Sequence, residues 1–153
     1  MVGPPGAAPP IIIYLPPGPV SPAIDDAAQD VASVLCSTAS ATVVQINYRL
    51  SAQHKYPTCI HDVLRGYDWI LEHLVPTRAV HRPGRLLKHT TPIAVCGELI
   101  GGGLATMLAL TECRMNGPCV AAAAVNEPLV DWVFPEEHLE DLSKISLVFV
   151  NSR

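Results

Sequence analysis

Short apolar runs alternate with longer segments of helical periodicity along most of this chain. These short runs predict four strands, at Ile11–Leu15, Thr42–Tyr48, Ile93–Cys96 and Cys119–Val125. The first, third and fourth are nearly continuous in apolar residues and are expected to be buried strands, as in a sheet covered on both faces.

The segments between these runs carry apolar residues at the spacing of one helix face. The first helix is predicted to begin at Ser21, with Pro22 in the first helical position and an apolar stripe at Ile24, Ala27, Ala28, Val31 and Leu35. The second helix carries its stripe at Ile60, Val63, Leu64, Tyr67, Leu71 and Leu74. A third helix follows Gly101 and is expected to turn inward Leu104, Met107 and Leu108.

Strands that alternate with helices predict an α/β fold with a doubly wound, mostly parallel sheet of about four strands and right-handed crossovers. Met1–Pro10 is rich in Pro, Gly and Ala and is predicted to be a disordered lead-in, so the domain comprises residues 11–153. Pro76–Thr90 is predicted to be a largely polar surface loop. The pattern assigns the apolar run Ile145–Val150 to neither helix nor strand.

One sharp turn joins the third predicted strand to the helix that follows it. Its sequence is Gly97-Glu98-Leu99-Ile100-Gly101. The nucleophile elbow of α/β-hydrolases has the pattern Gly-x-Ser-x-Gly, in which the serine is lifted to the top of the sheet. The frame of that elbow is present in this chain, with Leu99 at the serine position.

A wider set of residues carries the same resemblance. Tyr48-Arg49-Leu50 is followed by Pro57, then by Asp62 and Trp69 on a predicted helix, and then by the elbow. In order and spacing this resembles the hormone-sensitive-lipase-like branch of the α/β-hydrolases, from about Ile11 to Pro128. The resemblance implies the central part of an α/β-hydrolase fold and an esterase ancestry.

The chain departs from that family at its reactive positions. An aliphatic side chain such as Leu99 cannot form an acyl-enzyme. The family's His-Gly-Gly-Gly oxyanion loop is matched by Pro16-Pro17-Gly18-Pro19, in which Pro17 and Pro19 offer no N–H, so that of the glycine positions only Gly18 is left to donate. The family's catalytic acid and histidine lie after further strands, and two strands that precede Ile11 in the family have no counterpart. We therefore interpret the chain as a divergent, truncated member and assign it no catalytic residue.

Other reactive side chains have simpler interpretations. Glu98 is expected to have a structural or solvent-facing role, and Cys96 to be a core thiol. Ser51 and His54 are close in sequence, but a catalytic triad is a spatial arrangement, so their proximity carries no prediction. Asp62 is interpreted as a structural charge near the start of a helix.

Composition narrows the possible partners. The chain is 49% hydrophobic and 16% charged with a net charge of -4, and its basic residues between Arg78 and Lys88 lack interleaved aromatics, so we predict no nucleic-acid binding. The five cysteines are scattered, which favours free thiols and a cytoplasmic location. Neither a signal peptide nor a membrane-spanning run is evident, and the histidines lack metal-site spacing, so no membrane partner, metal or cofactor is expected.

Three hypotheses about function follow. The first is a pseudo-hydrolase that binds a small apolar ligand or a partner near Leu99, Gly18 and Ile100. The second is an esterase that acts by an unconventional or partner-completed site, and the third is a fragment without independent function. Loss of the family's outer strands would expose two sheet edges, so self-association is also expected.

Overall fold

The computed structural model describes residues 9–18, 24–51, 53–75, 78–82, 85–89, 91–113 and 119–131. Its helices are α1 (Ile24–Ala39), α2 (Thr58–His73) and α3 (Leu99–Thr111). Its strands are β1 (Ile11–Leu15), β2 (Thr42–Gln45), β3 (Arg78–Arg82), β4 (Arg85–His89), β5 (Ile93–Glu98) and β6 (Val120–Asn126).

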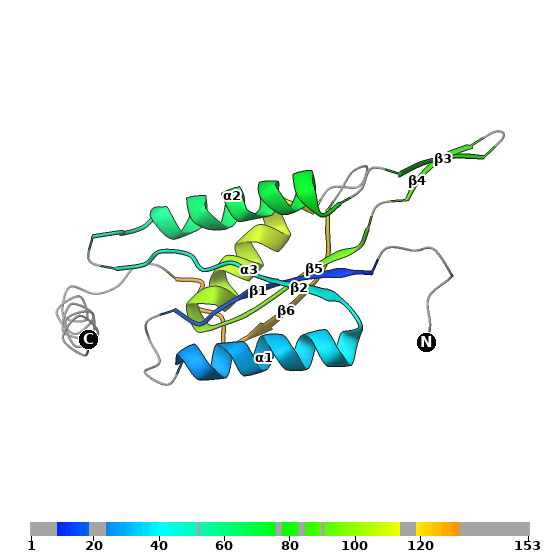
Figure 1. Cartoon of the computed structure of the whole chain (residues 1–153). Helices are drawn as coiled ribbons and strands as arrows, with labels where there is room; N and C mark the ends of the chain where they lie inside the picture. The colour runs from blue at the N-terminus through cyan, green and yellow to red at the C-terminus, as the bar shows by residue number, and fades with distance from the viewer. Residues whose placement is uncertain are drawn as a thin grey trace.

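Four parallel strands form the main sheet, in the order β2-β1-β5-β6. Helix α1 covers one face of the sheet, and α2 and α3 cover the other (Figure 1). The chain crosses from β1 to β2 through α1 and from β5 to β6 through α3, and these steps run in opposite directions on opposite faces. Both crossovers therefore have the same hand, as the rule for parallel sheets requires. The predicted α/β class and the four-stranded parallel sheet are confirmed.

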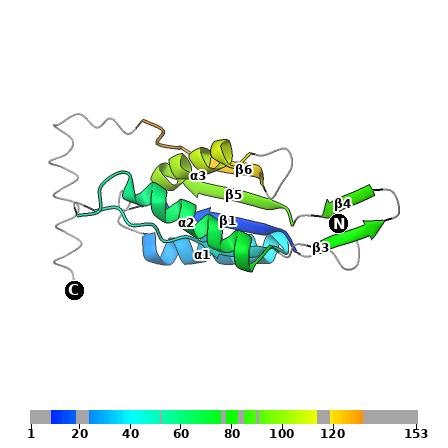
Figure 2. The same ribbon diagram turned by 90° about the horizontal axis from the view of Figure 1, so that it is seen from above.

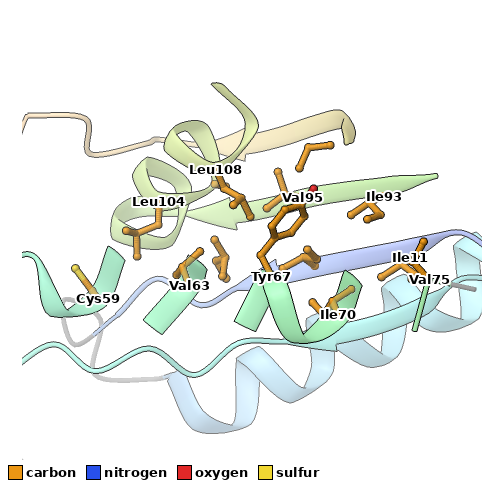
Figure 3. Close-up of a cluster of buried hydrophobic side chains, with 14 of the residues drawn as sticks. Ile11, Cys59, Val63, Tyr67, Ile70, Val75, Ile93, Val95, Leu104 and Leu108 are labelled. Carbon is orange, nitrogen blue, oxygen red and sulfur yellow. The ribbon is translucent and has the colours of Figure 1, made fainter. Parts of the chain in front are cut away.

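The hydrophobic core lies between the sheet and the pair α2 and α3 (Figure 3). Strand residues that alternate along β1 and β5 enter it, and Val63, Tyr67, Leu104 and Leu108 meet them from the helices. The helix stripes predicted these four residues. Their other members on α2, such as Ile60 and Leu71, pack against the core only partly, whereas Cys59 and Ile70 are fully buried and were missed.

The second predicted strand is too long. Strand β2 ends at Gln45. The N–H of Ile46 still donates to the carbonyl oxygen of Tyr14 in β1 at 3.1 Å, and the chain then continues to Tyr48 outside the ladder. The third strand is longer than predicted and continues through Gly97 to Glu98. Periodicity does not mark these ends, because the position of the neighbouring strand decides where pairing stops.

The prediction of a loop at Pro76–Thr90 is wrong, because β3 and β4 form an antiparallel hairpin within it. Figure 2 shows this hairpin beyond the end of the main sheet. In the sequence, Pro83-Gly84 separates two five-residue runs that mix Arg, His and Lys with apolar residues. A turn dipeptide between such runs is a hairpin pattern, and the high charge of the segment hid it.

The fourth strand is present, one residue later than predicted at each end, but the prediction that it is buried is wrong. Only Val120 is buried, and every later residue of β6 is exposed. In the described part of the chain, no strand pairs with the outer edge of β6.

Several predictions fall on residues outside the described ones. These are Met1–Ala8 of the lead-in, the helix start at Ser21-Pro22, Pro19, and the run Ile145–Val150. Helix α1 is described from Ile24. Within the described segments, no helix is both long enough and apolar enough to cross a membrane.

Candidate functional site

The carboxyl ends of β1 and β5 lie side by side, since these strands pair in parallel from Ile11 with Ile93 to Leu15 with Gly97. In open α/β sheets, ligands bind at this edge. Two turns meet there. One is Pro16–Gly18, which follows β1, and the other is the junction of β5 and α3.

The junction of β5 and α3 has no intervening loop. Glu98 ends the strand, and Leu99 begins the helix with a left-handed φ of 49°. Non-glycine residues rarely adopt this conformation, which is typical of strained functional turns. The five elbow residues predicted from the sequence therefore form a tight strand-to-helix turn, with Leu99 at its apex.

Two glycines allow the elbow to pack closely. A Cβ atom on Gly97 would lie 2.5 Å from the carbonyl oxygen of Gly101. A Cβ atom on Gly101 would collide with the carbonyl oxygens of Leu15 and Pro16. The first turn of α3 therefore lies directly against the end of β1, and the structure brings the elbow and the Pro16–Gly18 turn into contact.

Gly18 faces the same region. Its φ is 81°, and a Cβ atom there would lie 3.4 Å from Cδ1 of Ile100 and 3.1 Å from the hydroxyl oxygen of Tyr48. Pro16 is half-buried and Pro17 is buried. Gly18, Ile100 and the end of β1 thus line one site, while the fourth member of the predicted oxyanion loop, Pro19, lies outside the described residues.

Tyr48 is part of this site, although no sequence pattern assigned it a role there. Its hydroxyl donates a hydrogen bond of 2.5 Å to the carbonyl oxygen of Pro16. Burial, with smaller effects of Cys59 and Tyr14, raises the pKa of Tyr48, so the hydroxyl keeps its proton and acts as a donor. The side chain of Tyr48 thereby fixes the turn that carries Gly18. The available indication in the sequence was the tyrosine itself, because a buried tyrosine ring usually finds a hydrogen-bond partner for its hydroxyl.

The next residue attaches the same loop to α2. The Arg49 side chain donates to both carboxylate oxygens of Asp62, with Nε to Oδ2 at 2.9 Å and Nη2 to Oδ1 at 2.8 Å. The main-chain N–H of Arg49 also donates to Oδ2 at 3.0 Å. Hydrogen bonding from Arg49 lowers the pKa of Asp62 to about 2. Asp62 is therefore a structural charge, and it holds the loop in place.

The segment that leaves β6 covers another side of the elbow. The main-chain N–H of Leu129 donates to the carbonyl oxygen of Leu99 at 2.9 Å. A Cβ atom on Gly102 would lie 3.1 Å from Cα of Pro128. Residues 126–129 thus pack against the first turn of α3.

Two nucleophilic side chains of the described residues, Cys96 in β5 and Ser51 in the loop after β2, lack the features of an activated nucleophile. Cys96 is half-buried, and burial raises the pKa of its thiol, with a smaller contribution from the charge of Glu98. Ser51 and His54 interact through a turn, in which the main-chain N–H of His54 donates to Oγ of Ser51 at 3.1 Å. Among the residues that the structure describes, no group of three His, Cys, Asp or Glu side chains could hold a metal ion.

Comparison with known proteins places these features in context. A family model described as alpha/beta hydrolase fold matches residues 21–148. Esterase LipI of Mycobacterium tuberculosis is 32% identical over 95 residues, which make up 61% of this chain and 27% of LipI. An ethyl acetate hydrolase of Pseudomonas putida is 32% identical over 75 residues, or 49% of this chain and 21% of the hydrolase. The chain thus spans about a quarter of the length of these relatives.

A solved structure agrees with this match at the level of the fold. The crystal structure of esterase LipW from Mycobacterium marinum superposes with a TM-score of 0.63 and 21% identity, covering 96% of this chain and 48% of LipW. At this identity, the likeness establishes the arrangement of strands and helices and nothing about activity.

Proposed function

The chain belongs to the α/β-hydrolase fold family, in its hormone-sensitive-lipase-like branch, and from this premise we propose that it binds a small apolar molecule at the elbow without hydrolysing it. The observation that carries this proposal is Leu99. It occupies the apex of a strained strand-to-helix turn, where an esterase of this family presents its serine. A turn of this kind lifts its side chain out of the sheet, and here the side chain is an aliphatic one that cannot attack an ester.

The composition of the site supports binding rather than catalysis. Ile100 lies against Gly18, and the hydroxyl of Tyr48 is already engaged with Pro16. An oxyanion hole needs several N–H groups aimed at one point, and in Pro16–Pro19 the prolines supply none. A site of this kind favours apolar contact and offers few donors to a developing negative charge.

A second candidate function is ester hydrolysis by a site that another chain completes. Two observations favour it. The curated relatives include an esterase and an ethyl acetate hydrolase, and the outer edge of β6 is exposed beside the elbow. Such an edge is a place where a further strand can add, from a second copy or from another protein. Self-association of the chain is part of this proposal. The predicted cytoplasmic location stays a prediction.

Hydrolysis of a short p-nitrophenyl ester separates the two functions. The folded chain is assayed beside Leu99→Ser and beside Leu110→Ser, a matched control at a position that is 77% exposed on the same helix. Under the binding proposal the wild-type chain and the control match a heat-inactivated blank. Turnover by the wild-type chain that a fluorophosphonate probe abolishes would contradict it and support the esterase.

Binding itself is tested by thermal shift with a series of short aliphatic alcohols and esters. We expect the melting temperature to rise with a ligand in the wild-type chain, and the rise to shrink in Leu99→Asp, since a charge at the apex disfavours apolar contact. No rise with any ligand would contradict the proposal. A chain that fails to melt cooperatively would instead support the third hypothesis, a fragment without independent function.

A further inference from the structure

The connection between α3 and β6 is closed by one main-chain hydrogen bond. Helix α3 ends at Thr111, and β6 begins at Val120. The N–H of Val120 donates to the carbonyl oxygen of Glu112 at 3.2 Å. The chain therefore leaves the helix and returns to nearly the same point before it enters the sheet. Figure 2 shows α3 and β6 side by side.

A cysteine stands at each end of this closed connection. The bonded carbonyl belongs to the peptide unit that joins Glu112 to Cys113, and the bonded N–H belongs to the unit that joins Cys119 to Val120. With ordinary peptide dimensions, the two cysteine Cα atoms cannot lie more than about 8 Å apart. A disulfide needs a Cα separation of about 4.4 to 6.8 Å with the two Cβ atoms facing each other, so the bound of about 8 Å keeps this pair close to the range in which a disulfide can form.

The five cysteines differ in how well they are placed for this chemistry. Both Cys113 and Cys119 are free, the first exposed and the second half-buried. Cys59 is fully buried in the core, and Cys96 is half-buried in β5. Cys36 is exposed, and its thiol interacts with the carbonyl oxygen of Ala41 at 3.6 Å. Among the five, only Cys113 and Cys119 flank the hydrogen bond between Glu112 and Val120.

We propose that Cys113 and Cys119 form a reversible disulfide that links the start of β6 to the end of α3. This disulfide would lie at the start of the edge strand β6, in which Val120 is buried and the other residues are exposed. It goes beyond ligand binding at the elbow, because it lies at the opposite end of α3 and does not depend on any ligand.

The oxidant is a small-molecule disulfide such as oxidised glutathione. The thiolate of the exposed Cys113 attacks one sulfur of glutathione disulfide, and the first glutathione leaves as a thiolate. The thiolate of Cys119 then attacks Sγ of Cys113 in the mixed disulfide, and the second glutathione leaves. The two protein thiols lose two electrons and two protons, and these appear in two molecules of reduced glutathione.

The experiment uses the full chain, reduced and then incubated with oxidised glutathione. Intact mass spectrometry is expected to show loss of two hydrogen atoms, and thiol titration to show loss of two of the five thiols. Trypsin cuts after Arg114, so the bond should join two tryptic peptides, and fragmentation distinguishes Cys113 from Cys96 in the first. The oxidised chain should melt about 5 °C higher than the reduced one, because the bond restricts the unfolded chain.

Matched variants make the result specific. Cys36→Ser should still form the bond and show the rise in melting temperature, whereas Cys113→Ser should show neither. Cys113→Ala provides a second test of the same position. A persistent glutathione adduct on Cys113, a bond that maps to another pair of cysteines, or a bond that leaves the melting temperature unchanged would each overturn the proposal.

Discussion

Strands β5 and β6 are neighbours in one parallel sheet and have similar apolar sequences, yet their surroundings differ. In β5, alternate residues are buried, and Val95 is 1% exposed. In β6, Val125 is 41% exposed, and Val120 alone is buried. The difference comes from position, since β5 lies between two strands and β6 lies at the edge. An apolar run shows that a strand can be buried, and its neighbours decide whether it is.

The same contrast exists along α3, and there it predicts the largest effect. Leu104 is fully buried between α3 and the sheet, whereas Leu110 is 77% exposed. Leu104→Ala should lower the free energy of unfolding by about 2 to 5 kcal/mol, because it removes buried methyl groups and leaves a cavity. Leu110→Ala should change it by less than about 0.5 kcal/mol. Urea unfolding measures both, and equal losses would contradict the contrast.

The strands themselves provide the next test. Val95→Ala should cost about 2 kcal/mol of unfolding free energy, because two buried methyl groups are lost from the core. Val125→Ala should cost less than about 0.5 kcal/mol, since its side chain is largely in water. Both changes delete the same atoms, so the difference reports burial alone. A large loss at Val125 would mean that the outer edge of β6 is covered in solution.

These contrasts show how far the sequence predicts the fold. The class and the central core residues follow from periodicity, because residues such as Val63 and Leu104 face the sheet wherever its edges fall. Periodicity does not predict whether β6 is buried, because burial of a strand depends on the elements that lie next to it in the fold. The hairpin of β3 and β4 was missed because its many charged residues hid a strand pattern.

The candidate site also has one part that can be predicted from the sequence and one part that cannot. The elbow around Leu99 is visible in the sequence, since glycine spacing and an abrupt change from strand to helix are local features. The hydrogen bond from Tyr48 to Pro16 is not, because it joins residues 32 positions apart in the chain. Local geometry at the elbow is therefore predictable, whereas the contacts that position the second turn require the fold.

Tyr48→Phe tests the contact that holds the Pro16–Gly18 turn in place. It removes the hydroxyl that donates to Pro16 and leaves a partly buried carbonyl without that donor, which should cost about 1 kcal/mol of unfolding free energy. Tyr48→Leu should cost more, because packing of the ring against the core is lost as well. Urea unfolding of the three proteins gives both differences. Equal stability of Tyr48→Phe and wild type would show that the hydroxyl does not hold the turn.

The smallest change in the free energy of unfolding is expected in the segments that follow the two outer strands, β2 and β6. The chain beyond β2 is held by the ion pair of Arg49 and Asp62, while the chain beyond β6 is held by the main-chain bond from Leu129 to Leu99. Only the first of these titrates. Hydrogen bonding from Arg49 lowers the pKa of Asp62 from 3.8 to about 2 in the folded chain. The carboxylate therefore adds stability that is fully present above about pH 4 and is lost as the pH falls through about 2.

Asp62→Asn removes this titration and keeps the shape of the side chain. The wild-type chain should be more stable than the variant at pH 7, and the gap between their urea midpoints should close as the pH falls from 4 to 2. The gap should also narrow in high salt, because the Arg49 side chain is 57% exposed and its charge is screened. A gap that is independent of pH would contradict this prediction. It would mean that main-chain and packing contacts hold the loop beyond β2, as they hold the segment beyond β6.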